Sequence, residues 1–315
     1  MTTGPRFDLA VAPGGYAWWY VDALSDDGQH GLTIIAFIGS VFSPYYAWAR
    51  GRTPGGAAEP LNHCAFNVAL YGAAGKRWAM TERGARHVER STRHFRVGPS
   101  ALQWDGDTLT LQIDEVTAPW PSRIRGTVRL HPAALMSRAY ALDDAGAPRW
   151  PPIAPCARVE VELSKPGLRW GGTGYFDTNQ GDAPLERDFV RWDWSRAALS
   201  GGRTAALYDV TRRRGKPLSL ALAFDPDGSV QTFEAPPPAP LPPGLWQVAR
   251  GTRTDRGSLA HVEQTLEDAP FYARSLVSAT LLGQPVKAVH ESLSLDRFSS
   301  PWVRMLLPFR MPRRP

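Results

Sequence analysis

The sequence predicts an all-β fold, and three observations support this. Apolar and polar residues alternate with a period of two through much of the chain, whereas convincing helical periodicity is scarce. Gly and Pro number 29 each among 315 residues, as expected where many turns join short strands. Asp-Gly steps separate alternating runs at two places, which indicates antiparallel hairpins. Sandwiches and barrels are the architectures that combine these features.

The expected strands follow in chain order. Residues 17–37 form two alternating runs around an Asp-Asp-Gly turn. Residues 108–116 and 157–163 each place three apolar side chains on one face, as a strand with one buried face requires. Residues 224–233 contain the second Asp-Gly turn and predict another hairpin.

Two Pro-rich stretches offer domain breaks. Residues 148–156 and 235–244 are rich in Pro but too short to be disordered linkers. At 315 residues the chain can hold one large or two ordinary domains. Two β-rich halves of similar size would allow two related barrels.

Composition indicates a folded protein with a basic balance. The chain is 43% hydrophobic and 21% charged, and its formal charge is +6. Because the arginines are scattered through expected strands, nucleic acid is a weak candidate partner. The longest apolar run, from Leu32, has about half of the roughly 20 residues that a membrane-spanning helix needs. The first residues lack the features of a secretory signal, so we expect a cytoplasmic protein.

The signatures of metal and cofactor chemistry are absent from the sequence. Cys64 and Cys156 stand far apart with no Cys or His at ligand spacing, which predicts two buried free thiols. Asp177 occupies a position where a dinucleotide fingerprint would need glycine. Neither a HExxH helix nor a GxSxG elbow occurs. We therefore expect neither a metal nor another cofactor.

Residues 171–194 crowd carboxylates and aromatic rings between glycines. Strand alternation would place Trp192 and Trp194 on one face and Asp193 on the other. These indoles could line an apolar cavity or simply fill a core. Asp177 also has a structural alternative, because Asp close to Asn often forms a turn.

A second acid and ring lie downstream, in residues 206–215. Tyr208 and Asp209 would point to opposite faces of a strand, and three arginines follow near a turn. An acid beside arginines is often a surface ion pair, so this acid has both a functional and a structural interpretation.

The C-terminal residues 301–315 mix apolar side chains, among them Trp302, Leu306 and Phe309, with arginines. This combination suits a membrane interface, where rings enter the headgroup region and arginines meet lipid phosphates. The alternative is a final strand that packs on the core and ends in a frayed tail.

Seven long ungapped blocks of the sequence are far more specific than a short motif. These blocks are residues 35–52, 61–72, 77–84, 121–130, 172–197, 207–215 and 289–313. Through them the sequence resembles the carotenoid 1,2-hydratase (hydroxyneurosporene synthase) family of photosynthetic bacteria over nearly the whole chain. The opening residues 18–28 also resemble the wider superfamily of paired lipocalin-like barrels.

The resemblance implies two lipocalin-like antiparallel β-barrels, residues 1–185 and residues 186–315, the second with a basic amphipathic tail. It implies a cofactor-independent hydro-lyase that adds water to the terminal C1=C2 bond of an acyclic carotenoid such as neurosporene or lycopene. The product would be a 1-hydroxy carotenoid. Because the substrate resides in the bilayer, we expect peripheral association with the inner, photosynthetic membrane. The sequence makes no prediction of oligomeric state.

This chemistry needs an acid among aromatic rings. Protonation at C2 creates a tertiary cation at C1, so the site needs a carboxyl that keeps its proton and rings that stabilise the cation. Asp177 and Asp209 are the candidates for acid and base, in either order. Asn179 would orient the water, and Tyr208 would face the cation. The expected substrate-binding residues are Tyr175, Trp192, Asp193 and Trp194.

One departure from the superfamily pattern bears on these roles. Many relatives have a His within an Asp-His-Asn-Trp-Gly stretch, whereas Thr178 and Gln180 flank Asn179 in this chain. Another group must then handle the proton, which gives Asp177 and Asp209 more weight. Two other functions stay open: a carotenoid carrier without catalysis, and a cofactor-free cyclase or isomerase of the same superfamily.

Overall fold

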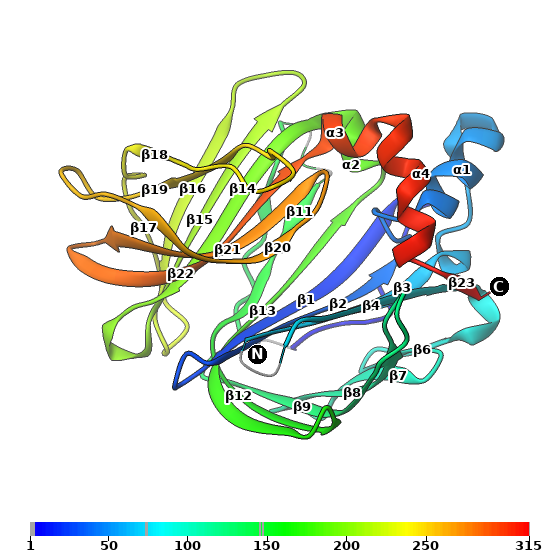
Figure 1. The fold of residues 1–315 in the computed structure, drawn as a ribbon, viewed down its shortest axis with the longest axis horizontal. Coiled ribbons are helices and arrows are strands. Elements are labelled where there is room, and N and C mark those ends of the chain that lie inside the picture. The colour runs from blue at the N-terminus through cyan, green and yellow to red at the C-terminus, as the bar shows by residue number, and fades with distance from the viewer. Residues whose placement is uncertain (1–3, 73–74, 145, 147, 315) are drawn as a thin grey trace. The chain divides into compact units, whose positions relative to one another are not determined.

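The computed structural model describes residues 4–72, 75–144, 146 and 148–314. The chain divides into two compact units (Figure 1). The first unit comprises Met1–Ala141, Ala145–Pro184 and Met305–Pro315, and the second comprises Leu142–Asp144 and Leu185–Arg304. Strands dominate both units, so the all-β expectation is confirmed.

The first unit is built on one long sheet. Its strands are β1 (Tyr16–Ser25), β2 (His30–Ile38), β3 (Cys64–Gly72), β4 (Arg77–Arg83), β5 (Val88–Arg90), β6 (His94–Val97), β7 (Ser100–Trp104), β8 (Leu109–Val116), β9 (Arg123–Pro132), β10 (Tyr140–Ala141), β11 (Arg149–Trp150), β12 (Pro152–Lys165), β13 (Leu168–Gly181) and β23 (Arg313–Arg314). The order across the sheet is β23-β4-β3-β2-β1-β13-β12-β9-β8-β7-β6-β5, with β10 and β11 off this path. The sequence-distant strands β1 and β13 are therefore neighbours.

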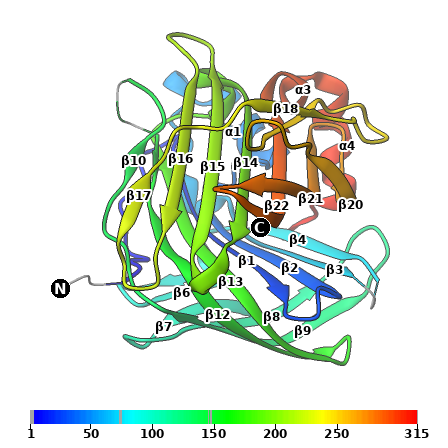
Figure 2. The same cartoon turned by 90° about the vertical axis from the view of Figure 1, so that its left-hand side faces the viewer.

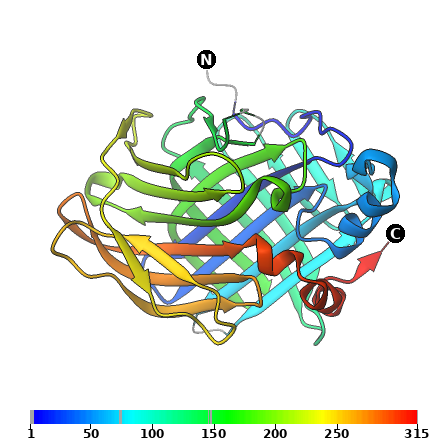
Figure 3. The ribbon, with the colours of Figure 1, turned by 90° about the horizontal axis from the view of Figure 1, so that it is seen from above.

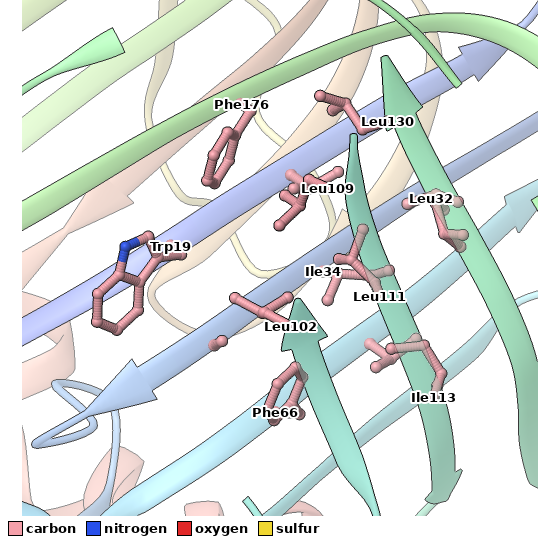
Figure 4. Packing of buried hydrophobic residues seen from close by; sticks show 14 of the residues in the cluster. Trp19, Leu32, Ile34, Phe66, Leu102, Leu109, Leu111, Ile113, Leu130 and Phe176 are labelled. Atoms are coloured by element: carbon pink, nitrogen blue, oxygen red, sulfur yellow. The ribbon is translucent and has the colours of Figure 1, made fainter. Parts of the chain in front are cut away.

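This sheet curls around an apolar core (Figure 4). Alternate residues of β1, such as Trp19 and Val21, point into the core, where they meet Leu102, Leu109 and Leu130 of the strands on the other side. Period-two alternation thus buries one complete face of each strand. Cys64 belongs to this core and Cys156 is also buried, which confirms that both cysteines are buried.

Short helices connect the strands of the first unit. Helix α1 (Pro44–Arg52) begins after Ser43, whose side chain accepts a hydrogen bond from the Tyr46 amide. Pro44 at the first helical position has no amide hydrogen to leave unpaired. This unit also contains the 3₁₀ helices η1 (Pro54–Gly56), η2 (Pro60–Asn62) and η3 (Ala85–His87).

The second unit has a seven-stranded antiparallel sheet and a separate strand pair. Its strands are β14 (Phe189–Ala198), β15 (Thr204–Arg212), β16 (Leu218–Phe224), β17 (Val230–Thr232), β18 (Pro238–Leu241), β19 (Arg250–Arg253), β20 (His261–Asp268), β21 (Tyr272–Leu281) and β22 (Gln284–Ser294). The sheet order is β17-β16-β15-β14-β22-β21-β20, and β18 pairs with β19. Figure 2 shows β14, β15 and β16 side by side. The short helices are α2 (Leu185–Asp188), η4 (Ser200–Gly202) and α3 (Leu295–Ser299).

Both expected hairpins are confirmed. Strands β1 and β2 pair around Gly28, and β16 and β17 pair around Gly228. Each glycine has a positive φ, 69° and 90°, a backbone conformation that a side chain disfavours. The alternating runs 108–116 and 157–163 also form strands, within β8 and β12.

The alternative of a final strand over the C-terminal residues does not hold for most of the segment. Residues Pro301–Arg310 form helix α4, and Arg313–Arg314 form a short strand, β23 (Figure 3). Strand β23 runs parallel to β4. The buried side chains Val303 and Leu307 are four residues apart, which is the spacing of one helix face. No helix in the described part of the chain is long and apolar enough to cross a bilayer.

Candidate active site

The face of the first unit's sheet that points away from the apolar core combines acids with aromatic rings. On β13 and β1, alternate residues put Asp177 opposite Tyr20 and Asp22 opposite Tyr175. On β2, Thr33 lies next to Asp22 in the same register. We name this surface the acid–aromatic face; its residues on β13, β1 and β2 are Tyr175, Asp177, Asn179, Trp18, Tyr20, Asp22, Thr33, Ile35 and Phe37.

Asp177 is held at the centre of this face by two neutral donors. The Trp150 indole donates to its Oδ2 at 2.7 Å, and the Tyr175 hydroxyl donates to the same oxygen at 2.9 Å. Asp177 itself is 5% exposed. Burial raises the pKa of the Tyr175 phenol well above its ordinary value, and the adjacent Asp177 carboxyl raises it further. Tyr175 therefore stays a neutral hydrogen-bond donor.

A second carboxyl, Asp22, lies on the neighbouring strand. It is completely buried, and the Tyr20 hydroxyl donates a hydrogen bond to its Oδ2 at 3.3 Å. The rings of Tyr20 and Tyr175 meet edge to face, with centroids 6.2 Å apart. Each acid is thus paired with a tyrosine on its own strand and lies opposite a tyrosine on the other.

Further rings extend the face along β1 and β2. The Tyr16 ring stacks on Trp18 with centroids 5.0 Å apart, and Trp18 contacts Phe37 at 6.0 Å. The π faces of such rings attract a cation, by up to about 2 kcal/mol each where water is excluded. The face therefore carries groups for proton transfer and groups for stabilising positive charge.

Two buried oxygens on the face have no hydrogen-bond partner within the described residues. They are Oδ1 of Asn179 and Oγ1 of Thr33, in side chains that are 2% and 3% exposed. An unsatisfied buried polar group costs about 1–3 kcal/mol, so such an atom favours a polar ligand or water beside it. Both oxygens suit the binding of a water molecule.

A small polar pocket lies at the end of β13. It has a volume of about 150 Å³ and is lined in part by Tyr16, Arg149, Gln180 and Asp182. Gln180 follows Asn179 directly, and Tyr16 stacks on Trp18 of the acid–aromatic face. The pocket therefore places polar groups near the Asn179 end of the acid–aromatic face. Among described residues, no group of three His, Cys, Asp or Glu side chains is placed to hold a metal ion.

The sequence-predicted residues of the second unit lie on two faces of its sheet. Trp192, Trp194 and Tyr208 share one face and are buried, while Asp193 and Asp209 are cross-strand partners on the other. The alternation expected for these two strands is confirmed. The rings of Trp192 and Tyr208 contact each other edge to face at 6.2 Å.

Asp193 and Asp209 are both held in ion pairs. Arg253 donates from Nε and Nη2 to the Asp209 carboxylate at 2.8–3.0 Å. Arg191 approaches Asp193 at 2.8 Å. These surroundings differ from those of Asp177, whose hydrogen bonds come from an indole and a phenol.

Of the sequence-predicted residues, Tyr175, Asp177 and Asn179 come together on the acid–aromatic face of the first unit, and the others belong to the second unit. Sequence reasoning missed Trp150, Tyr20 and Asp22. Trp150 stood in a Pro-rich stretch that was interpreted only as a break. The signal for Tyr20 and Asp22 was the polar residue within an otherwise apolar alternating run.

The fold and the face together define a class of protein. A lipocalin-like β unit that buries a carboxyl between an indole and a phenol can hold an apolar ligand beside a proton donor. The chain belongs to the carotenoid hydratase family, since the family model "Carotenoid hydratase CrtC" matches residues 34–315.

Three similar proteins carry the name acyclic carotenoid 1,2-hydratase. The protein of Thiocapsa roseopersicina is 59% identical over 311 residues, which cover 98% of this chain and 76% of that protein. The protein of Rubrivivax gelatinosus is 56% identical over 310 residues, with the same coverage. That of Cereibacter sphaeroides is 42% identical over 283 residues, or 90% of this chain and 98% of that protein.

Two solved structures share the fold. A putative AttH from Nitrosomonas europaea matches with a TM-score of 0.61 and 16% identity, over 92% of this chain and 94% of that one. Kievitone hydratase from Nectria haematococca matches with a TM-score of 0.55 and 9% identity, over 94% and 99%. The likeness confirms the lipocalin-like fold.

Proposed function

We propose that this protein is a hydro-lyase that adds water to the terminal C1=C2 bond of acyclic carotenoids, giving 1-hydroxy carotenoids. The observation that carries the proposal is the buried Asp177 carboxyl between Trp150 and Tyr175. It occurs in a family whose similar members are named acyclic carotenoid 1,2-hydratases.

Asp177 acts as the general acid. Its carboxyl proton passes to C2, the π electrons form the new C–H bond, and C1 becomes a tertiary cation. Shielding from water favours the neutral, proton-carrying form of a carboxyl. As the proton leaves, the hydrogen bonds from Trp150 and Tyr175 stabilise the negative charge that develops on Asp177.

The rings of the acid–aromatic face stabilise the cation at C1. Trp18, Tyr20 and Phe37 present π faces without a nucleophile strong enough to trap it. Asn179, with its buried carbonyl oxygen, helps to hold the attacking water. Trp192, Trp194 and Tyr208 form a second ring cluster and are proposed to contact the polyene. Asp193, beside Arg191, is retained as a substrate-contacting residue.

The test is the activity of Asp177→Asn on lycopene or neurosporene, with no cofactor added. Loss of a general acid should lower hydration by roughly 10²–10⁴-fold. Asp193→Asn, in an ion pair of the second unit, serves as a comparison, because its loss should affect substrate contact more than proton transfer. Product mass separates hydration, which adds one water, from isomerisation, which adds none. Near-normal hydration by Asp177→Asn would remove this residue from the acid role.

We also propose that the protein contacts a membrane peripherally through helix α4. Four apolar side chains of the helix are exposed and share one face, at the spacing i, i+3, i+4 and i+7. Arg314, which is exposed, follows shortly after the helix, and basic groups favour an anionic lipid surface. The exposed residues are Trp302 (43%), Met305 (68%), Leu306 (40%) and Phe309 (69%).

A further inference from the structure

Asp22 is a buried acid whose position suits a role in proton transfer. It is 0% exposed and lies within β1, on the acid–aromatic face rather than in the apolar core. A carboxyl so fully removed from water is unfavourable in a fold unless its surroundings or its function require it.

The pairing of β1 with β13 brings the two acids of the face into a diagonal arrangement. Asp22 is directly opposite Tyr175, and Asp177 is two residues further along β13. Diagonal neighbours in an antiparallel pair lie about 7–8 Å apart at the backbone, within reach of side chains across the gap. The two side chains are therefore near enough to act on one substrate bond and one water molecule.

The polar groups around Asp22 suit a bound water. The Tyr20 hydroxyl donates to Asp22 and so fixes the orientation of the carboxylate. Thr33 is next to Asp22 on the adjacent strand, and its buried hydroxyl oxygen has no hydrogen-bond partner within the described residues. A water between Asp22 and Thr33 would satisfy that hydroxyl.

We propose that Asp22 is the general base of the hydration, a role that rests on the proposed function. Two buried carboxyls on one face favour a state with a single proton between them, here on Asp177, so that Asp22 is the carboxylate. Asp22 then holds the water that attacks C1 after Asp177 has protonated C2. The water oxygen forms the C–O bond, its O–H bond breaks, and the proton goes to Asp22. Return of one proton from Asp22 to Asp177 resets the site. The net reaction is alkene plus water to tertiary alcohol, with no change of oxidation state.

This assignment differs from the sequence-based candidate for the second acid–base group, Asp209. The Asp209 carboxylate already accepts hydrogen bonds from Nε and Nη2 of Arg253 and from the Ser219 hydroxyl. Asp22 instead shares a face with the acid Asp177 and lies beside an unsatisfied hydroxyl.

The experiment is lycopene turnover in D₂O by Asp22→Asn, Asp177→Asn and Asp209→Asn. In Asp22→Asn the acid is intact, so a cation still forms, but it returns a proton instead of capturing water. We expect hydration to fall by roughly 10²-fold or more. Deuterium incorporation into recovered lycopene, which measures reversible protonation and is called exchange below, should fall far less. The ratio of exchange to hydration should therefore rise at least tenfold. Asp177→Asn should lose both exchange and hydration.

Thr33→Val provides a second, nearly isosteric variant that keeps both carboxyls. It should also raise the ratio of exchange to hydration, which a merely structural defect would not do. Circular dichroism and thermal unfolding establish that each variant is folded.

Several results would overturn the role of Asp22. These are wild-type hydration by Asp22→Asn, equal loss of exchange and hydration in that folded variant, or the raised ratio appearing in Asp209→Asn instead. If Asp22→Asn does not fold, an unchanged ratio in Thr33→Val has the same effect. Failure of the acid assignment is separate, because it requires Asp177→Asn to retain exchange and hydration.

Discussion

At the scale of single residues, the candidate acids differ in the groups that donate hydrogen bonds to their carboxyls. Arginine pairs with Asp209 and Asp193, whereas an indole and a phenol bind Asp177. A guanidinium brings a positive charge to the carboxyl, whereas an indole and a phenol donate hydrogen bonds without one. This difference supports the proposed role of Asp177 as the proton donor.

Removing the phenol oxygen should weaken this arrangement selectively. In Tyr175→Phe, Asp177 loses the hydrogen bond from the phenol, which in the proposed mechanism stabilises its developing charge. A hydrogen bond to a charged group contributes about 1.5–3 kcal/mol, so kcat should fall by roughly 10- to 150-fold. KM should change little. Steady-state assays with Tyr45→Phe on helix α1 as the control measure this; equal losses in both variants would contradict the role.

His290 predicts a pH dependence of stability. Burial lowers its pKa below the ordinary value of 6.5, although the nearby Asp193 carboxyl opposes the shift. Below pH 6.5 the unfolded chain therefore binds a proton that the folded chain refuses, and stability falls as pH drops from there toward the lowered folded pKa.

Urea unfolding at pH 7.5 and pH 5.5 measures this loss. His290→Asn should lose less stability between the two pH values than the unmodified protein, by at most about 1.4 kcal/mol per pH unit. His261→Asn, at an exposed position of β20, should behave like the unmodified protein. An unchanged pH slope in His290→Asn would contradict the prediction.

At the scale of elements, the short strand β23 anchors the chain end to β4. Arg313 pairs with the buried Glu82, and His63 contacts the same carboxylate at 2.9 Å. Glu82 is 1% exposed, so loss of the guanidinium would leave a buried charge poorly compensated. The ion pair therefore secures the residues that follow α4.

Arg313→Ala should accordingly destabilise the first unit. We expect a loss on the order of 1–3 kcal/mol, less than for a fully buried pair because Arg313 is partly exposed and His63 remains. The matched control is Arg314→Ala, the exposed neighbour in the same strand. Thermal unfolding of both variants gives the comparison, and indistinguishable midpoints would argue against the anchoring role.

At the scale of the whole molecule, a protein that acts on a long apolar polyene must meet its substrate where that substrate resides. In the proposal, the acid–aromatic face supplies the chemistry and the exposed face of α4 supplies a surface for lipid. Because α4 leads into β23, removing the entire C-terminal segment would disturb the fold as well as the lipid contact. Point substitutions on the exposed face separate the two effects.

The double variant Met305→Glu and Phe309→Glu should lose binding to anionic phospholipid vesicles. Its activity on vesicle-borne lycopene should fall at least tenfold, while activity on detergent-solubilised lycopene stays within about twofold, since carboxylates are repelled by the lipid surface. Leu259→Glu, at an exposed apolar position of the second unit, is the control. Equal activity losses on the two substrate forms would contradict membrane docking.

Sequence by itself determined the features that local chemistry controls. Alternation defined the strands, and Asp-Gly steps defined the hairpins, because both depend on residues close together in the chain. It also identified Asp177, within a block that resembles a known family. Helix α4 was not foreseen, since its short apolar period also fitted a strand.

Only the tertiary structure decided which groups share the site. Trp150 reaches an oxygen of Asp177 because β11 pairs with β13. Asp22 lies diagonally across from Asp177 because β1 pairs with the distant β13. That pairing is nonlocal, and no pattern within either strand specifies its register. Asp209 lies in the other unit, where it is paired with Arg253. Local sequence patterns therefore determine the strands, whereas the pairing of distant strands determines which side chains share the candidate site.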